Sequence, residues 1–285
     1  IQSLLNIFIS KINPIQALHD FNDTRLFSEI FPEFGRVWGQ VQFDIYHHYT
    51  TDEHLLLTLH NLSELRQKSF YNEIYSRLNY REALHLALLF HDIGKKGHKS
   101  HSVYGKELTN KILKRLPVSK EIKELTLWLV ENHLAMSDTA FKNDTQSPEA
   151  IAKFTSVANT EEKINSLFLF TLCDIASVGP NVLNEWRISL LRSLFYNARD
   201  FLQRGLDTKT YSTSVQKSLK KSVLQQSDVN LKKFIEKSIK EFPNQFWEAF
   251  SSRMIVDIFK IYQRNKKAKI INSVNFLNYE NKEYS

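Results

Sequence analysis

Histidine and aspartate side chains that can bind a divalent cation stand where several predicted helices begin or end. In the segment REALHLALLFHDIGK (81–95), apolar residues recur at helical spacing, and this stripe ends in the pair His91-Asp92. Adjacent imidazole and carboxylate groups allow the aspartate to bridge two cations while the histidine binds one. Comparable stripes end at His133 and Asp174, and two further predicted helices begin at His54 and His101. We therefore predict that these side chains face one bundle interior, where helical proteins usually build metal sites.

The candidate ligands are widely separated in the sequence. From His91 onward to His133 and to Asp174, each interval is roughly 40 residues, whereas zinc fingers place their ligands in close pairs. The ligands must therefore come from separate helices. Mixed nitrogen and oxygen ligands suit Mn, Fe, Co, Mg or Zn without choosing among them. We expect one or two divalent metal ions, with Mn or Mg favoured.

Most of the other histidines are predicted to be structural. A histidine on an apolar face is more often a satisfied core or surface side chain than a metal ligand. The histidines interpreted in this way are His19, His47, His48, His60 and His85. His98, in the segment GHKSH (97–101), is the alternative to His101 as a ligand.

The composition of the chain favours an all-α fold. Its 285 residues are 42% hydrophobic and 24% charged, which is typical of a globular protein. Glycine and proline contribute only 7 and 6 residues, too few for a turn-rich sandwich, a barrel or a glycine-looped nucleotide fold. The formal net charge of +7 is typical of a solvated surface and does not by itself indicate binding to nucleic acid.

No sequence feature points to a membrane or to an oxidising compartment. The lone Cys173 cannot form an intramolecular disulfide, and we interpret it as a small buried residue in the run LFLFTLC (167–173). That run is far shorter than the ~20 apolar residues of a membrane span, and no signal peptide is recognised. We expect a cytoplasmic protein with no membrane partner. Because the sequence begins with Ile1, we also expect it to be a piece of a longer chain.

The sequence pattern predicts three parts. Residues 1–45 form an irregular helical lead-in, because INP (12–14) and FPEFG (31–35) break any long helix. Residues 46–200 contain the candidate ligands and form the core domain, and residues 201–285 form a helical C-terminal extension.

Local signals define several predicted helices. Thr50 with Glu53 is a candidate capping box at the first core helix, and Ser100 is the candidate cap of a later helix. Two helical stripes are predicted in the extension; the first comprises Leu231, Phe234, Ile235, Ile239 and Phe242, and the second comprises Trp247, Phe250, Met254, Ile258 and Ile261.

Four segments around the candidate ligands carry a more specific signal. They are YTTDEHLL (49–56), LLFHDIGKKGHKSHSVYG (88–105), WLVENHLAMSDTA (128–140) and CDIASVGPNVLNEWRISLLRSLF (173–195). Together they resemble the successive motifs of HD-superfamily metal phosphohydrolases. More narrowly, they resemble the HD domain of the bifunctional uridylyltransferase/uridylyl-removing enzymes that modify the nitrogen-signalling PII protein. The resemblance extends upstream through EFGRVWGQVQFDIYHHYT (33–50) and covers residues 30–200 closely.

This resemblance implies roles for individual residues. The residues that match the first metal site of HD proteins are His54, His91, Asp92 and Asp174, and those that match the second are Asp92, His101 and His133. Lys95 matches a lysine placed near the scissile phosphate, so that Lys95 and Asp92 are the implied catalytic residues. Ser100 stands where family members often have aspartate, which removes a carboxylate from the surroundings of the second metal.

The resemblance implies an HD-type helical bundle that hydrolyses a phosphodiester and removes UMP from a uridylylated tyrosine of PII. The sequence has no Gly-Ser motif with paired aspartates, as a nucleotidyltransferase domain needs, and no ACT domains follow. We therefore expect the chain to remove UMP from PII but not to add it. Two alternatives stay open: a generic HD nucleotide phosphohydrolase or phosphodiesterase, and a catalytically inert module that docks PII. No nucleic-acid partner is expected.

Overall fold

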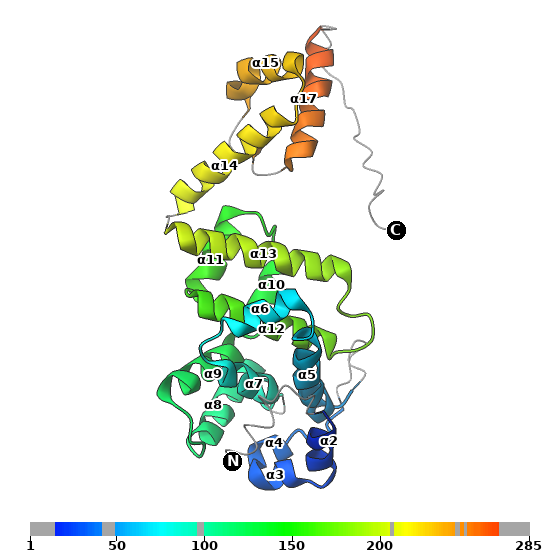
Figure 1. Ribbon diagram of the computed structural model, residues 1–285, viewed down its shortest axis with the longest axis vertical. Coiled ribbons are helices and arrows are strands. Elements are labelled where there is room, and N and C mark those ends of the chain that lie inside the picture. The colour runs from blue at the N-terminus through cyan, green and yellow to red at the C-terminus, as the bar shows by residue number, and fades with distance from the viewer. Residues whose placement is uncertain are drawn as a thin grey trace. The chain divides into compact units, whose positions relative to one another are not determined.

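The computed structural model describes residues 15–41, 49–95, 100–205, 208–242, 246–247 and 250–267. Every regular element in these ranges is a helix, which confirms the predicted all-α fold. The chain divides into two compact units, Ile1–Gly205 and Leu206–Ser285 (Figure 1). Among the helices of the described ranges, none is long and apolar enough to span a membrane.

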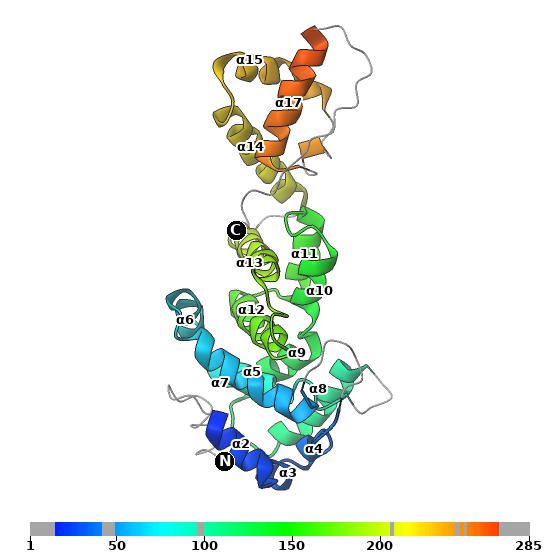
Figure 2. The same ribbon diagram turned by 90° about the vertical axis from the view of Figure 1, so that its right-hand side faces the viewer.

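The first unit is a bundle of helices. Its helices are α2 (Ile15–Asp23), α3 (Leu26–Ile30), α4 (Pro32–Gly35), α5 (Thr51–Leu65), α6 (Ser69–Ser76), α7 (Arg81–Phe90), α8 (His101–Leu113), α9 (Lys120–Asn132), α10 (Ala135–Lys142), α11 (Pro148–Val157), α12 (Glu161–Ala176) and α13 (Glu185–Arg204). Helix α7 packs against α5 and α9, α8 packs against α9, and α12 packs against α5 and α13. Figures 1 and 2 show α5, α7, α9 and α12 close together in this unit.

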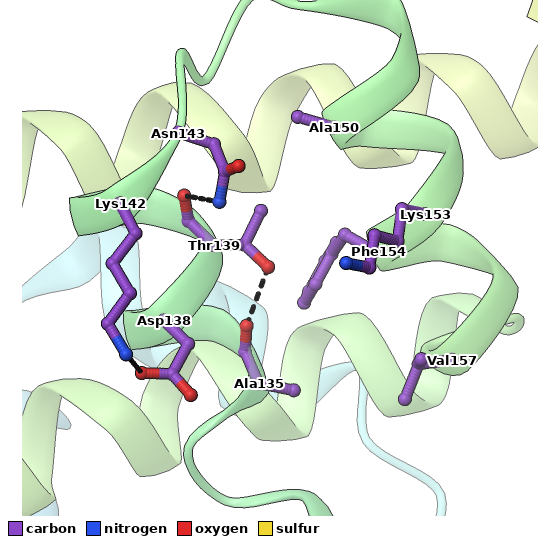
Figure 3. Close-up of a pocket in the computed structure, with 9 residues that line it drawn as sticks. All are labelled: Ala135, Asp138, Thr139, Lys142, Asn143, Ala150, Lys153, Phe154 and Val157. Carbon is purple, nitrogen blue, oxygen red and sulfur yellow. Dashed lines mark hydrogen bonds and ion pairs between the residues drawn. The ribbon is translucent and has the colours of Figure 1, made fainter.

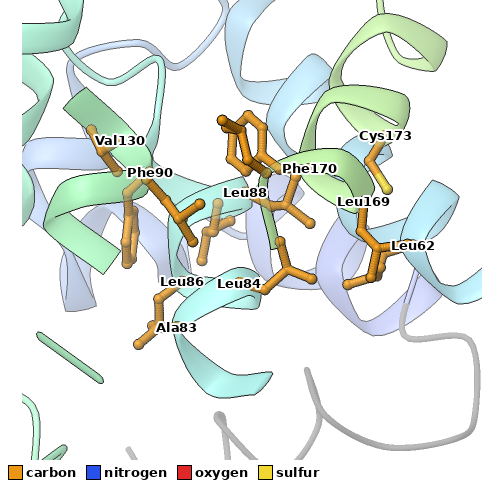
Figure 4. Close-up of a cluster of buried hydrophobic side chains, with 14 of the residues drawn as sticks. Leu62, Ala83, Leu84, Leu86, Leu88, Phe90, Val130, Leu169, Phe170 and Cys173 are labelled. Atoms are coloured by element: carbon orange, nitrogen blue, oxygen red, sulfur yellow. The ribbon is translucent and has the colours of Figure 1, made fainter. Parts of the chain in front are cut away.

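Helices α7 and α12 are buried around most of their circumference. All residues from Ala83 to Phe90 of α7 are buried, as are residues 164–173 of α12. A helix of this kind belongs in the interior of a bundle, and Figure 4 shows side chains of both helices in one apolar cluster. Cys173 lies in this cluster, as predicted, and burial raises the pKa of its thiol. The buried packing of both helices fixes the positions of the candidate ligands at their carboxyl ends.

The described part of the lead-in packs on the core helices. Helix α2 contacts α5, and α4 contacts α8. The buried Asp52 carboxylate accepts hydrogen bonds from Asn22 Nδ2 at 2.9 Å and from the Gly39 backbone N–H at 3.0 Å. Arg115 binds the Glu33 carboxylate through both terminal nitrogens, at 2.8 and 2.6 Å. These contacts make the lead-in part of the first unit; the predicted boundary after residue 45 lies outside the described residues.

The first unit ends with α13. This helix continues to Arg204, past the predicted end of the core domain at residue 200. Gly205 then adopts the left-handed conformation with φ 58°, which is the usual way for glycine to terminate a helix. The chain therefore leaves the first unit at Gly205.

Two of the predicted side-chain caps do not form. Thr50 and Ser100 occupy the N-cap positions of α5 and α8, as predicted, but neither side chain makes a capping hydrogen bond. Capping oxygens that do accept a backbone N–H belong to Ser119, Ser147, Thr160, Asn184 and Asp228. The packing of α5 and α8 in the bundle holds their first turns without this interaction.

The second unit has its own apolar core. Its described elements are α14 (Thr208–Gln225), α15 (Val229–Ser238), the 3₁₀ helix η1 (Ile239–Glu241) and α17 (Ser252–Lys267). The first predicted stripe is confirmed: Leu231 and Ile235 are buried, and the rest of the stripe packs against the same cluster. Trp247 is buried in this core, as predicted.

The predicted stripe of α17 was wrong by one residue. The buried side chains are Ile255, Val256 and Phe259, whereas Met254 and Ile258 are only partly buried. Apolar residues stand side by side along this helix, so two registers fit the helical period equally well. Phe259 lies 4.8 Å from Phe242 and 6.0 Å from Trp247 between ring centroids; this tertiary contact selects the register.

Replacing His85 by leucine is expected to make the stability of the protein less sensitive to acid. His85 is buried in α7, its Nδ1–H donates to the Arg81 carbonyl at 2.8 Å, and its ring lies 5.9 Å from that of Tyr75. Burial lowers the pKa of His85 to about 4, below the value near 6.5 expected for the unfolded chain. As the pH falls, His85 is protonated in the unfolded state before it is protonated in the folded state. The free energy of unfolding therefore decreases as the pH falls from 6.5 towards 4.

Urea unfolding of the wild type and of His85→Leu between pH 7.5 and 4.5 measures this effect. The wild type is expected to lose up to about 3 kcal/mol more than the variant over that interval. Parallel pH profiles would contradict the prediction.

Candidate metal centre

The predicted ligands lie at helix termini that meet in the first unit. They are His54 near the start of α5, His91 and Asp92 in the turn after α7, His101 at the start of α8, His133 at the end of α9 and Asp174 in the last turn of α12. Helix α7 contacts α5, α9 and α12, and α9 contacts α8 and α12. The apolar stripes that bury these helices therefore deliver all six side chains to one region.

Four ligand atoms surround one point. The Nε2 atom of His54 lies 3.1 Å from Asp174 Oδ1 and 3.4 Å from His91 Nε2. The Nε2 atom of His91 lies 3.3 Å from Asp92 Oδ2 and 3.4 Å from Asp174 Oδ1, and Asp92 Oδ2 lies 3.7 Å from His54 Nε2. An ion with ligand bonds of about 2.0–2.2 Å holds neighbouring ligand atoms roughly 3–3.5 Å apart. The spacing of the His54, His91 and Asp174 atoms therefore fits a single cation, and Asp92 Oδ2 lies beside two of them.

A second group of candidate ligands contains Asp92 and lies next to the first group. Ligand atoms of Asp92, His101 and His133 lie within 4.8 Å of one another, and the His101 and His133 ring centroids are 5.4 Å apart. The Oδ1 atom of Asp92 is buried and has no hydrogen-bond partner within the described part of the chain. A buried carboxylate oxygen without a donor is costly unless it meets a cation. This donor set fits a second cation, which Asp92, His101 and His133 would hold.

Backbone carbonyls fix the orientation of three of the histidines. A carbonyl oxygen can only accept a hydrogen bond, so the Nδ1 atom beside it carries the proton and Nε2 keeps a lone pair for a cation. The pairs are His54 with the Ser177 carbonyl at 3.1 Å, His91 with the Leu88 carbonyl at 3.0 Å and His133 with the Val130 carbonyl at 2.8 Å.

The buried carboxylates of Asp92 and Asp174 stabilise positive charge in the centre. Burial alone would lower the pKa of His91, but Asp92 and Asp174 raise it to about 10. Burial raises the pKa of each carboxyl group, and the opposing attraction of His91 holds both pKa values below the usual range. Burial and, after it, the charge of His91 lower the pKa of His133 to about 4. His133 therefore stays neutral, while a proton on His91 supplies the charge that a cation would bring.

Lys95 lies at the open side of this centre. Its Nζ atom is 2.6 Å from Asp92 Oδ2, and its side chain is 19% exposed. Asp174 is 17% exposed, whereas His91 and Asp92 are almost fully buried. Solvent therefore reaches the centre beside Lys95 and Asp174.

Two glycines that the sequence analysis did not assign to the site bring the His-Asp turn against α8. A Cβ atom on Gly94 would lie 2.3 Å from the His101 carbonyl oxygen and 2.4 Å from the Gly105 nitrogen. A Cβ atom on Gly105 would lie 2.9 Å from the His91 carbonyl oxygen. Backbone therefore passes directly over backbone here, which sets the separation between Asp92 and His101. The glycines in HDIGK and HSVYG were the only sequence signal of this contact.

Replacing Gly94 by alanine is expected to destabilise the first unit by about 1–3 kcal/mol or more, because the added methyl group meets rigid backbone. Urea denaturation followed by circular dichroism measures the loss. Gly39→Asn is the control, since Gly39 has φ 63° and no atom within 4 Å of its Cβ position, a conformation that asparagine tolerates. Equal unfolding midpoints for Gly94→Ala and the wild type would contradict the prediction.

The remaining histidines divide into structural ones and undescribed ones. His19 Nδ1 lies 3.4 Å from the Glu53 carboxylate, away from the two ligand groups, and His85 belongs to the core. His60 is partly buried on α5 and belongs to neither ligand group. The histidines that lie outside the described residues are His47, His48 and His98. The structure thus brings His101 to the second group and does not describe its alternative.

Comparison with known proteins finds one matching domain family and several similar enzymes. Residues 51–176 match the model of the HD domain family. The chain is 38% identical over 207 residues to the bifunctional uridylyltransferase/uridylyl-removing enzyme of Novosphingobium aromaticivorans, a match that covers 70% of this chain and 23% of the relative. The enzyme of the same name from Zymomonas mobilis is 35% identical over 209 residues, which cover 71% of this chain and 23% of the relative. The chain therefore spans less than a quarter of the length of these relatives.

Proposed function

We propose that the protein removes UMP from a uridylylated tyrosine of the PII signalling protein, on the premise that residues 51–176, which match the HD domain family, form a metal-dependent hydrolase domain. The names of the similar enzymes include uridylyl removal, and the motifs that carry the resemblance surround the ligand groups. PII is the proposed partner because the resembling family modifies it. Mn²⁺ or Mg²⁺ is the proposed cofactor.

The convergence of six candidate ligand side chains, with Asp92 next to both His54 and His91, is the observation that carries the proposal. When bound, divalent cations supply Lewis acidity to a phosphate and bring the pKa of a coordinated water towards neutrality. His54, His91 and Asp174 would hold one cation, His101 and His133 the other, and Asp92 would contact both. A phosphodiester needs both chemical contributions, because its phosphorus is shielded by negative oxygens.

The direct test is incubation of the purified chain with uridylylated PII and Mn²⁺ or Mg²⁺. Release of UMP, measured by chromatography, and loss of one uridylyl mass from PII are the expected results. An Asp92→Asn chain under the same conditions is the control. If small nucleotides are hydrolysed while uridylylated PII is untouched, the chain is a generic HD phosphohydrolase; if neither is hydrolysed, the proposed activity is wrong.

Replacing Lys95 by alanine is expected to slow hydrolysis by about 10²-fold and to leave the metal content unchanged. The ammonium group of Lys95 stands beside Asp92 at the open side of the centre, where it can neutralise a phosphate oxygen in partly dry surroundings. Steady-state kinetics and elemental analysis of the purified variant measure the two quantities.

Lys106→Ala is the matched control for Lys95. Lys106, on α8, forms an exposed ion pair with Glu131 at 2.6 Å. Loss of this pair should leave turnover within about twofold of the wild type. Loss of bound metal from Lys95→Ala would make Lys95 a structural residue and contradict the prediction.

A further inference from the structure

Two cavities of the first unit each enclose about 330 Å³ but differ in their free hydrogen-bonding groups. One lies between α10 and α11 (Figure 3). Most of its polar side chains bond to their own helix: Lys142 to Asp138 at 2.7 Å, Thr139 to the Ala135 carbonyl at 2.8 Å, and Asn143 to the Thr139 carbonyl at 3.3 Å. Lys153 also lines it. Apart from the Lys153 ammonium group, the polar groups of this cavity are largely used within their own helix, and its lining is charged.

The other cavity, here called the α5 cavity, lies beside the metal centre. Residues that line it are Tyr49, Leu57, Asn61, Ala176, Asn181 and Leu183. On α5, Leu57 and Asn61 lie one and two turns beyond His54 on the same side of the helix. The Nδ2 atom of Asn61 donates to Ser177 Oγ at 2.8 Å, and the Ser177 carbonyl accepts from His54 Nδ1 at 3.1 Å. Two hydrogen bonds thus connect the cavity wall to a metal ligand.

The lining of the α5 cavity indicates the chemistry of its ligand. None of its lining residues is charged, so a phosphate or carboxylate would find no counterion there. Tyr49 offers a partly exposed aromatic ring, and aromatic rings stack on unpaired nucleobases. Leu57, Ala176 and Leu183 supply apolar surface. A flat, neutral heterocycle is the ligand that these features fit.

The two side-chain amides add hydrogen-bonding selectivity. An asparagine amide pairs a donor with an acceptor, which is how it recognises the edge of a base. Asn61 donates one amide hydrogen to Ser177. Its second amide hydrogen and its carbonyl oxygen can bond to a ligand. The N3–H and carbonyl groups of uracil match that remaining pair. Asn181 provides a second amide from a left-handed backbone position with φ 62°.

We propose that the α5 cavity is the subsite for the uracil base of the substrate, with the adjoining phosphodiester at the metal centre. This inference rests on the proposed hydrolysis of a uridylyl group. It assigns binding of the base to Asn61, Asn181 and Tyr49. None of the six candidate metal ligands has this role.

Two 4-nitrophenyl esters test the subsite by kinetics. Uridine 5′-(4-nitrophenyl phosphate) and methyl 4-nitrophenyl phosphate share the leaving group, but only the first carries a base. With Mn²⁺, the wild type should show a KM at least about 10-fold lower for the uridine ester. Asn181→Gly should raise that KM by about 10-fold and leave kcat/KM for the methyl ester unchanged; glycine at 181 accepts the positive φ. Asn143→Ala, in the α10–α11 cavity, is the matched control and should change neither.

Titration of the Mn²⁺-loaded protein with UMP and with inorganic phosphate gives a readout that does not depend on turnover. UMP should bind at least about 10-fold more tightly than phosphate, and Asn181→Gly should remove most of the difference. Equal affinities in the wild type, or an unchanged difference in the variant, would overturn the subsite. If UMP binds in this Asn181-dependent way while neither ester nor uridylylated PII is hydrolysed, the subsite stands and the proposed function fails.

Discussion

Replacement of Asp92 by asparagine is expected to lower hydrolysis of a uridylyl ester by at least about 10³-fold while the helical fold persists. The substitution keeps the size of the side chain but removes its negative charge from both ligand groups. Its Oδ2 atom is within 3.7 Å of His54 and within 3.3 Å of His91, and its Oδ1 atom is the buried oxygen without a described partner. Kinetics, elemental analysis and thermal melting by circular dichroism measure activity, metal content and fold.

Asp138→Asn is the matched control for this substitution. Asp138 is an exposed carboxylate paired with Lys142 on α10, so its variant should keep wild-type turnover. His85→Leu should also keep turnover, because His85 belongs to the core rather than to either ligand group. Turnover of Asp92→Asn within about threefold of the wild type would remove Asp92 from the mechanism.

Removal of divalent cations with a chelator is expected to abolish hydrolysis and to draw about one proton per chain from solution at pH 8. In the cation-free centre, burial favours neutral His91, but Asp92 and Asp174 raise its pKa to about 10. His91 is therefore protonated at pH 8 without a cation and must lose that proton when a cation binds. Because the proton and the cation compete for His91, metal affinity should fall by about tenfold for each pH unit below 10.

An indicator dye in weakly buffered solution measures the proton uptake, after subtraction of the protons that the chelator itself releases when it binds Mn²⁺ without protein. A parallel assay follows activity through chelation and addition of Mn²⁺. The His91→Gln variant is the control, since it has no imidazole to protonate and should show no uptake at His91. Hydrolysis that survives exhaustive chelation would contradict the metal-dependent mechanism. Chelation of bound metal without proton uptake would contradict the charge state assigned to His91.

The helix ends that carry the ligands could be predicted because periodicity and chemistry agree there. The stripe of α7 has to face the core, and it continues into His91; the same reasoning applies to His133 after α9. Their role as metal ligands remains a prediction, although the structure brings the six side chains together. The contact between Gly94 and Gly105 could not be predicted in the same way, since close backbone approach depends on where two helices cross.

Other features depended on tertiary contacts that a periodic pattern does not contain. In α17, Ile258 and Phe259 are adjacent apolar residues, and only the aromatic side chains around Phe259 select the buried one. The N-cap positions of α5 and α8 were predicted, but whether a cap side chain bonds depends on its rotamer and its neighbours. The Ser177 carbonyl reaches His54 across 123 residues of sequence, and a carbonyl leaves no signature in the side-chain pattern.

That long sequence separation has a consequence for the order of folding. The centre is assembled from helix ends between α5 and α12, so a partly folded chain holds at most a fraction of the ligands. Long-range contacts of this kind form slowly, and tight cation capture should follow the docking of α5 on α12. A cation that binds only the native state stabilises it by about 2.7 kcal/mol when its free concentration is 100 times the dissociation constant. A newly made chain that binds a cation at this centre would thus unfold, and be cleaved by proteases, less readily when metal is abundant.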